Sequence, residues 1–255
     1  MMNHESWISE NNIKPYLFFN AFFFGPKQKK NNWLENSIKE VSTLPFDSIV
    51  DLGCGTGTVS FCFGKYIDNV VGIDSSPTML RVANAKKEKN AIINVIFEEA
   101  DMMKIDMFQA EAAFTSSLGH ILGEEGKREF FRLADYNSSL KWIFVYSPII
   151  VKNYKRTIEG EEIIKDAICK YRIASFTDFN KDCHFADYHF AFQEKTYDFS
   201  YCFDFIRPAH MDNLLKGTKW QVREIMRNPC IRKEREKNFE AVEIMYVIEK
   251  KQIKS

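Results

Sequence analysis

Short apolar runs alternate with longer amphipathic segments between residues 46 and 147. Each run has the length of a strand and is rich in β-branched and aromatic residues. The runs are SIVDLG, NVVGID, AIINVIF, EAAFTSS and LKWIFVYS. Helix-length segments separate them, and one begins with Ser76 at an N-cap position followed by Pro77. This alternation predicts an α/β fold with a doubly wound, Rossmann-like and mostly parallel sheet, whose ligands bind at the carboxyl ends of the strands.

The pattern changes after Pro148. Three β-rich segments separated by short polar turns follow: AICKYRIASF, CHFADYHFAF and KTYDFSYCFDF. They predict an antiparallel β insertion after strand five, and WQVREIMR with EAVEIMYVIEK predicts a final antiparallel strand pair of the main sheet. We therefore expect four regions: a helical N-terminal cover (1–45), a ligand-binding core (46–147), the insertion (148–206) and the C-terminal completion of the core sheet (207–255).

The composition limits the classes of protein to which the chain can belong. The chain has 35 Lys and Arg against 35 Asp and Glu, so the net charge is zero, whereas a dedicated nucleic-acid binder usually carries a basic excess. None of the six cysteines forms a CxxC pair, so we expect reduced thiols in a cytoplasmic protein and no metal site. The apolar run YLFFNAFFF is too short to span a membrane.

Three glycines follow the first predicted strand in VDLGCGTG. Gly53, Gly55 and Gly57 at a strand–helix junction allow a ligand to lie against the backbone. The spacing is G-x-G-x-G, which differs from the dinucleotide fingerprint G-x-G-x-x-G, and the Lys-Ser/Thr of a phosphate-binding P-loop is absent. Asp74 ends the second strand and Asp101 follows the third. Taken singly, Asp74 could equally be an N-cap and Asp101 a turn residue, rather than ligand-binding residues.

The segments VDLGCGTG, VVGIDSSPTML and VIFEEADM, in this order, resemble the class I S-adenosylmethionine-dependent methyltransferases over about residues 46–147. The resemblance implies that the glycine loop cradles the methionine part of the cofactor. It also implies that Asp74 accepts both ribose hydroxyls and that Asp101 reaches the adenine amino group. The positions expected to bind S-adenosylmethionine are Asp51, Gly53, Cys54, Gly55, Gly57, Asp74, Ser75, Met79, Asp101, Met102 and Thr115. The sequence departs from the family at Glu111, where an Asp is usual, and at SSLKW, where Pro-Gly-Gly is usual.

The segment TSSLGHI, after the fourth strand, matches the region that faces the substrate in this family. It holds neither the N/D-P-P-Y/F motif of amino-directed DNA methyltransferases nor a Pro-Cys nucleophile. A neutral amine acceptor needs no base, whereas a hydroxyl usually does, and His120 and His189 are the candidate bases. The candidate substrate-binding residues are Ser117, Tyr146, Tyr188 and Tyr201. Strict alternation puts the rings of the insertion strands on one face, where they either form core or cover the acceptor.

The expected function is therefore cytoplasmic methylation of a nitrogen or oxygen atom of a small molecule, without a nucleic-acid or membrane partner. Two alternatives stay open. One is a methyltransferase for RNA or protein, and the other is a catalytically silent cofactor-binding subunit.

Overall fold

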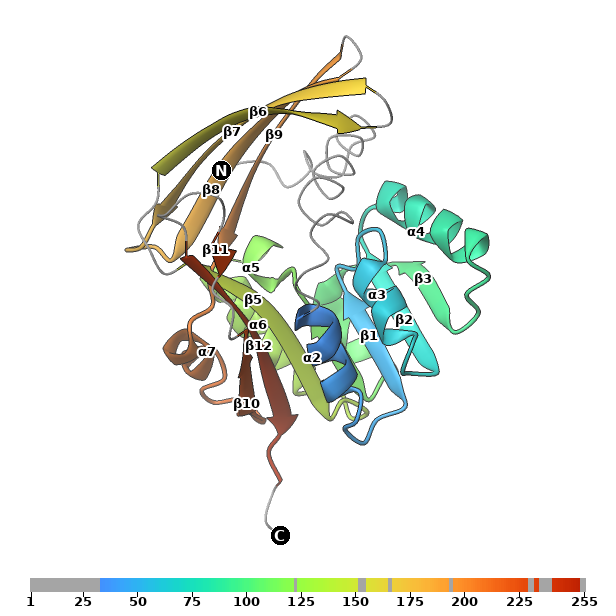
Figure 1. Cartoon of the computed structure of the whole chain (residues 1–255). Coiled ribbons are helices and arrows are strands. Elements are labelled where there is room, and N and C mark those ends of the chain that lie inside the picture. Colours follow the sequence, from blue (N-terminus) through green and yellow to red (C-terminus); the bar gives the residue numbers. More distant parts are fainter. Residues whose placement is uncertain are drawn as a thin grey trace. The chain divides into compact units, whose positions relative to one another are not determined.

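A computed structural model describes most of the chain, in the ranges 33–121, 123–150, 155–164, 167–192, 195–228, 232–233 and 240–252. The described residues fall into two compact units, which are treated separately below (Figure 1). The first unit comprises described residues within 33–148, 206–228 and 243–252. The second unit comprises described residues within 149–205, 232–233 and 240–242.

The main sheet has eight strands, seven of them in the order β10-β12-β5-β4-β1-β2-β3, and β11 pairs with β12. Neighbouring strands among β1 to β5 are parallel, and β10 pairs with β12 in antiparallel fashion. The strands are β1 (Ser48–Leu52), β2 (Asn69–Asp74), β3 (Val95–Glu99), β4 (Ala112–Thr115), β5 (Trp142–Ile150), β10 (Trp220–Arg227), β11 (Arg232–Lys233) and β12 (Glu240–Lys250). The predicted α/β sheet with its final antiparallel pair is confirmed.

The helices lie between the strands, as the amphipathic segments predict. They are α2 (Trp33–Val41), α3 (Thr58–Phe63), α4 (Pro77–Lys89), the 3₁₀ helix η3 (Met102–Met107), α5 (Leu118–Ile121), α6 (Glu124–Ala134) and α7 (Pro208–Leu214). Ser76 caps α4, since its hydroxyl accepts the Met79 N–H at 3.3 Å. Helix α3 ends at Phe63, with Gly64 at its C-cap. The Asn94 amide donates to the carbonyls of Gly64 and Ile67 at 2.8 and 2.9 Å, which satisfies the turn after the helix.

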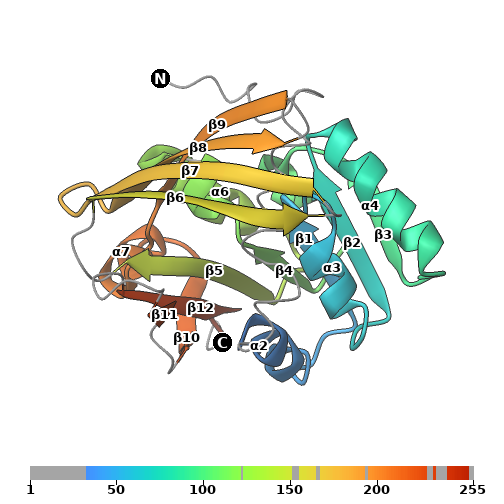
Figure 2. The same ribbon diagram turned by 45° about the horizontal axis from the view of Figure 1, so that its top comes forward.

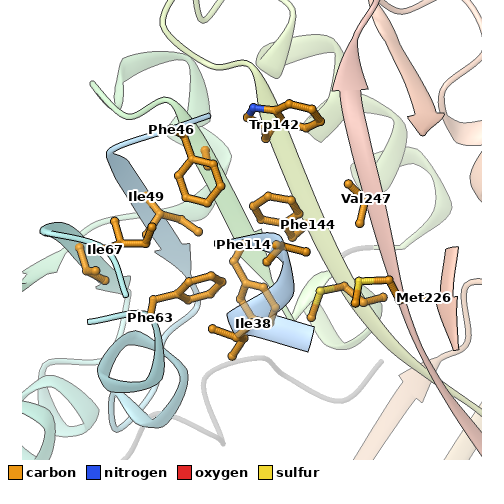
Figure 3. Packing of buried hydrophobic residues seen from close by; sticks show 14 of the residues in the cluster. Ile38, Phe46, Ile49, Phe63, Ile67, Phe114, Trp142, Phe144, Met226 and Val247 are labelled. Carbon is orange, nitrogen blue, oxygen red and sulfur yellow. The ribbon is translucent and has the colours of Figure 1, made fainter. Parts of the chain in front are cut away.

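Aromatic and aliphatic side chains fill the space between the strands and the helices α2 and α3 (Figure 3). The Phe63 and Phe114 rings lie 5.5 Å apart, and the Phe46 and Phe144 rings 5.6 Å apart. All four side chains are at most 5% exposed. Burial of such rings, each worth about 1.5–3 kcal/mol, fixes β1, β4 and β5 against the helices and thereby fixes where the strands end.

The second unit holds a four-stranded antiparallel sheet in the order β6-β7-β8-β9 (Figure 2). Its strands are β6 (Lys155–Ile164), β7 (Ala167–Asp178), β8 (Cys183–Phe192) and β9 (Lys195–Asp204). The sequence predicts only the last three. Strand β6 (KRTIEGEEII) was not predicted because five charged residues and Gly160 interrupt its apolar pattern. A Cβ at Gly160 would lie 2.5 Å from the Tyr171 hydroxyl, so a larger residue there would displace the Tyr171 ring.

The alternation expected for the insertion is present in β8. His184, Ala186, Tyr188 and Phe190 are all buried, while Asp187 and His189 between them are exposed. Phe203 of β9 and Phe205, which follows it, are buried as well. The side chains of Tyr197, Phe199 and Tyr201 lie outside the described residues. Within the part of the chain that the structure describes, no helix is long and apolar enough to cross a membrane.

Candidate cofactor site and methyltransferase domain

The strand order of the main sheet reverses between β1 and β4. Strand β2 lies on one side of β1 and β4 on the other, and Leu52 is paired with Thr115 where both strands end. A ligand of an open α/β sheet binds at this switch point, beyond the carboxyl ends of the strands. Ser117, just past β4, donates a hydrogen bond from its hydroxyl to the Gly53 carbonyl at 3.3 Å. This predicted substrate residue is therefore in contact with the glycine loop.

The glycine loop after β1 is fixed by its own protein contacts. The N–H groups of Gly53 and Cys54 both donate to the Ile73 carbonyl, at 2.9 and 2.8 Å. Gly53 and Gly57 adopt φ values of 74° and 77°, which disfavour any other residue. A Cβ would lie 2.7 Å from the Ser117 hydroxyl at Gly53 and 2.5 Å from the Phe97 ring at Gly57. Gly55 also has a positive φ, of 54°, so the fold itself favours glycine at all three positions, which the ligand-based interpretation of the sequence did not predict.

Asp74 ends β2 and faces the loop. Its Oδ2 accepts the Gly55 N–H at 2.8 Å and its Oδ1 accepts the Ser76 N–H at 2.9 Å. Burial raises the pKa of this carboxyl, and the two N–H donors oppose the shift. A carboxylate offers about four lone-pair positions, so each oxygen can still accept one hydroxyl. Asp74 is therefore held in one orientation with the capacity that a ribose diol needs.

Asp51 lies inside β1, 2% exposed. Its Oδ2 accepts a hydrogen bond of 2.6 Å from the Ser60 hydroxyl. Burial, assisted by the negative charge of Asp74, raises the pKa of Asp51 to about 7. The loop is consequently bordered by two carboxyl groups whose ionisation would be favoured by a positively charged ligand. Burial also raises the pKa of the neighbouring Cys54 thiol, so this cysteine stays protonated.

The residues expected around the adenine gather at the end of β3. The Ala100 N–H donates to the Asp74 carbonyl at 3.2 Å, which places Asp101 beside Asp74 along the sheet edge. Asp101 is exposed, and its Oδ1 caps η3 by accepting the Met103 N–H at 2.9 Å. Met79 and Met102 are buried, whereas Ser75 is exposed. The capping role of Asp101 is thus observed, and its adenine role stays a prediction.

Residues 49–135 match the family model described as a methyltransferase domain. Over these residues the chain carries a methyltransferase domain. The site described above fits S-adenosylmethionine, whose sulfonium and ammonium groups are positive, because two partly or fully buried acids border the loop. Asp51, Asp74, Asp101 and Thr115, which are expected to hold the cofactor, lie at or just beyond the carboxyl ends of four strands of this methyltransferase domain.

Two curated relatives match over part of their length. A Geobacillus sp. (strain WCH70) protein named as a methyltransferase is 24% identical over 145 residues, which is 56% of each chain. A 23S rRNA (uracil-C5) methyltransferase of Colwellia psychrerythraea is 29% identical over 89 residues, 35% of this chain and 19% of that protein. The chain thus spans about half, or less, of the length of the curated relatives it matches.

Several solved structures share the fold across most of the chain. An S-adenosylmethionine-dependent methyltransferase of Clostridium acetobutylicum aligns with a TM-score of 0.69 at 15% identity, over 95% of this chain and all of that one. A sugar N-methyltransferase of Streptoalloteichus sp. aligns with a TM-score of 0.59 at 15% identity, over 92% and 93% of the two chains. An amino pentose methyltransferase of Micromonospora echinaspora, solved with S-adenosylmethionine bound, gives a TM-score of 0.59 at 10% identity, over 90% and 96%.

Lys86 of α4 is a residue of the methyltransferase domain that the sequence did not single out. Its Nζ donates to the Thr56 carbonyl at 3.0 Å and contacts the Thr56 hydroxyl at 2.8 Å. Thr56 lies in the middle of the glycine loop and is buried, and burial lowers the pKa of Lys86. The lysine thus fixes the loop from the neighbouring helix. Nothing in the helix sequence distinguishes it from Lys87 or Lys89, so only the folded chain reveals it.

Replacing Lys86 by methionine is expected to weaken S-adenosylmethionine binding about three- to tenfold. The change removes both hydrogen bonds but keeps most of the side-chain length, and a net hydrogen bond from a half-buried charge is worth about 1 kcal/mol. Calorimetric titration measures the effect. Lys89→Met on the same helix, where the side chain is exposed, is the matched control. Equal affinities in the two variants would show that the Thr56 contacts do not position the loop.

Thr115, a predicted cofactor residue, and Tyr146, a predicted substrate residue, lie on neighbouring strands. Thr115 is fully buried at the end of β4, and Tyr146 lies one residue beyond Val145, the partner of Thr115 in β5. The Tyr146 hydroxyl donates to Glu243 Oε1 at 3.0 Å, and the Asn228 amide donates to Glu243 Oε2 at 2.9 Å. Glu243 was missed, although a single acid inside the apolar run AVEIMYVI was a usable signal.

The histidine candidates lie in different environments. His120 belongs to α5, directly after β4, but its side chain lies outside the described residues. His189 is exposed on β8 and pairs through Nδ1 with the Asp198 carboxylate on β9. It lies on the face of β8 opposite Tyr188, which is buried and stacks 6.1 Å from Phe190. The catalytic roles of both histidines, and the substrate roles of Tyr188 and Tyr201, stay predictions.

Proposed function

We propose that the protein transfers the methyl group of S-adenosylmethionine to a nitrogen or oxygen of a small-molecule acceptor. The observation that carries the proposal is the preorganised edge of the sheet, where Asp74 and the glycine loop are bonded to each other and Asp51 lies buried beside them. Keeping Asp51 buried and Asp74 partly buried has a desolvation cost, which a positively charged ligand would offset.

Two features favour a small acceptor. The sugar N-methyltransferase aligns over 92% of this chain and the amino pentose methyltransferase over 90%. The shared fold therefore includes the region after β5. The rRNA methyltransferase match covers about a third of the chain. A net charge of zero also gives no general attraction to RNA.

When bound, S-adenosylmethionine supplies an electrophilic methyl group, which moves to the acceptor lone pair while the sulfur keeps the electron pair of the broken bond. The chain's own residues bind and orient. Asp74 would hold the ribose, the loop the methionine part, and the buried Asp51 would balance positive charge. Alignment of donor and acceptor lowers the activation barrier by about 7–11 kcal/mol, so positioning is the main task of these residues.

The acceptor class is tested by methyl transfer to panels of small amines, small phenols and alcohols, bulk RNA and bulk protein, with mass detection of the product. Transfer to a member of the amine or hydroxyl panel is expected. Transfer to RNA alone would favour the alternative suggested by the rRNA methyltransferase relative. Cofactor binding without transfer to any panel would favour a silent subunit.

Replacing His120 by alanine distinguishes a hydroxyl acceptor from a neutral amine acceptor. If the acceptor is a hydroxyl, turnover is expected to fall by about 10²–10⁴ because the residue after β4 would act as the base. Cofactor affinity should be unchanged. His210→Ala is the control, since His210 of α7 is paired with the Glu124 carboxylate. Full turnover by His120→Ala would assign that histidine a structural role.

A further inference from the structure

Two cysteines and an aspartate meet where β8 begins and β9 ends. Cys183 is paired with Asp204, and Cys202 lies two residues before Asp204 on β9. Because side chains alternate along a strand, the three side chains share one face of the sheet. The two sulfur atoms and a carboxylate oxygen all lie within 4.8 Å of one another.

Sheet register holds this group in place. Cys183 is 5% exposed, and Cys202 and Asp204 are partly buried. The Phe205 N–H donates to the Asp182 carbonyl at 2.7 Å, which closes the ladder one residue beyond the group. Asp178 pairs with Cys183 from β7, but its carboxylate accepts the Asn180 N–H and lies 3.8 Å from the Lys181 ammonium. The three side chains therefore form a distinct cluster on two neighbouring strands.

We propose that Cys183, Cys202 and Asp204 bind a thiophilic divalent cation, with zinc the ion that best suits the donors. Thiolate and carboxylate are both common zinc ligands, at about 2.3 Å and about 2.0–2.2 Å. Tetrahedral ligands at these distances lie about 3.5–3.8 Å apart, so side-chain rotations that move each atom by about 1 Å complete the site. Three protein ligands leave one position for water. The expectation of no metal site rested on the absence of a CxxC pair, whereas the ligands proposed here are brought together by strand pairing.

The position of the three side chains in the fold indicates what a bound cation would do. Asp204 is followed by Phe205, which ends the 149–205 segment of the second unit, and Ile206 begins a segment of the first. A cation would link the start of β8 to the end of β9, where the chain leaves the insertion sheet. Binding releases the two thiol protons to solvent, so the bound ion carries two thiolates and one carboxylate.

The test uses the full chain, reduced and freed of metal by a chelator, and titrated with Co²⁺. We expect one equivalent to produce thiolate-to-cobalt charge-transfer absorption, which Zn²⁺ then removes. Cys183→Ser and Cys202→Ser should each abolish the band, and Asp204→Asn should weaken Co²⁺ binding tenfold or more. Cys62→Ser, a partly buried cysteine of α3, should leave the band unchanged. Zn²⁺ should also raise the melting temperature of the wild type but not of the cysteine variants.

Three results would overturn the proposal. The first is a wild type without a stoichiometric thiolate–cobalt band. The second is a band that persists in Cys183→Ser. The third is a Cys183–Cys202 disulfide, found by mass in protein prepared without reductant, together with no metal uptake after reduction. S-adenosylmethionine affinity measured on each variant checks that the unit with the cofactor residues is folded, and because the substituted residues lie in the other unit, this affinity should not change.

Discussion

Replacing Asp74 by alanine is expected to weaken S-adenosylmethionine binding by tenfold or more. A charged hydrogen-bond acceptor that holds two ribose hydroxyls is worth about 1.5–3 kcal/mol, and each 1.4 kcal/mol is a factor of ten in affinity. Calorimetric titration of wild type and variant measures the change. Asp68→Ala is the matched control, because Asp68 is an exposed acid of the same unit, just before β2.

The contacts of Asp74 with the backbone complicate a simple interpretation of that loss. The side chain also holds the Gly55 and Ser76 N–H groups, so its removal loosens the glycine loop. A double-mutant cycle separates the two effects by comparing S-adenosylhomocysteine with its 2′,3′-dideoxy analogue. The wild type should bind the analogue tenfold more weakly or worse, and Asp74→Ala should bind both alike. If the wild type does not distinguish the two ligands, Asp74 orders the loop but does not bind the ribose.

Local sequence patterns were enough to predict most of the fold. The runs that form β1, β2 and β4 are mostly apolar and show no strict alternation with polar residues, because most of their side chains are buried. Their order with intervening helices predicts a parallel sheet. Ser76 and Pro77 mark the start of α4 for local reasons that need no tertiary contact. Strand β6 was missed because its charged residues hide the pattern and its place is set by pairing with β7.

The candidate site was predictable where one segment carries the chemistry and was not where distant segments meet. The glycine loop and Asp74 are short motifs next to strand ends. The Lys86 side chain of α4 contacts Thr56 in the glycine loop, and Ser117, which follows β4, contacts Gly53, which follows β1. These contacts depend on strand order and helix packing, so a single sequence holds no local signal for them.

Asp51 is expected to make the stability of the protein depend on pH. Its pKa is about 7 in the folded chain against 3.8 as the ordinary value, because burial penalises the carboxylate and Asp74 repels it. A raised pKa means that the folded state binds the proton more tightly than the unfolded state. The stabilisation is therefore fully present below about pH 4 and is lost as the pH rises through 7. A difference of about three pKa units corresponds to about 4 kcal/mol of unfolding free energy.

Asp51→Asn removes this dependence, because asparagine resembles the protonated acid in shape and can still accept the Ser60 hydrogen bond. Urea unfolding from pH 4 to pH 8 should show the variant gaining on the wild type by a few kcal/mol as the pH rises. The difference at pH 4 gives the cost of the substitution itself.

S-adenosylmethionine, as a cation, should favour the ionised acid, so its binding to the wild type near pH 6.5 should release a proton. Calorimetry in buffers of different ionisation enthalpy detects that proton, and Asp51→Asn should not release it. Parallel stability profiles together with equal proton release in the two proteins would show that Asp51 is already ionised in the folded chain, with its charge balanced by contacts beyond Ser60.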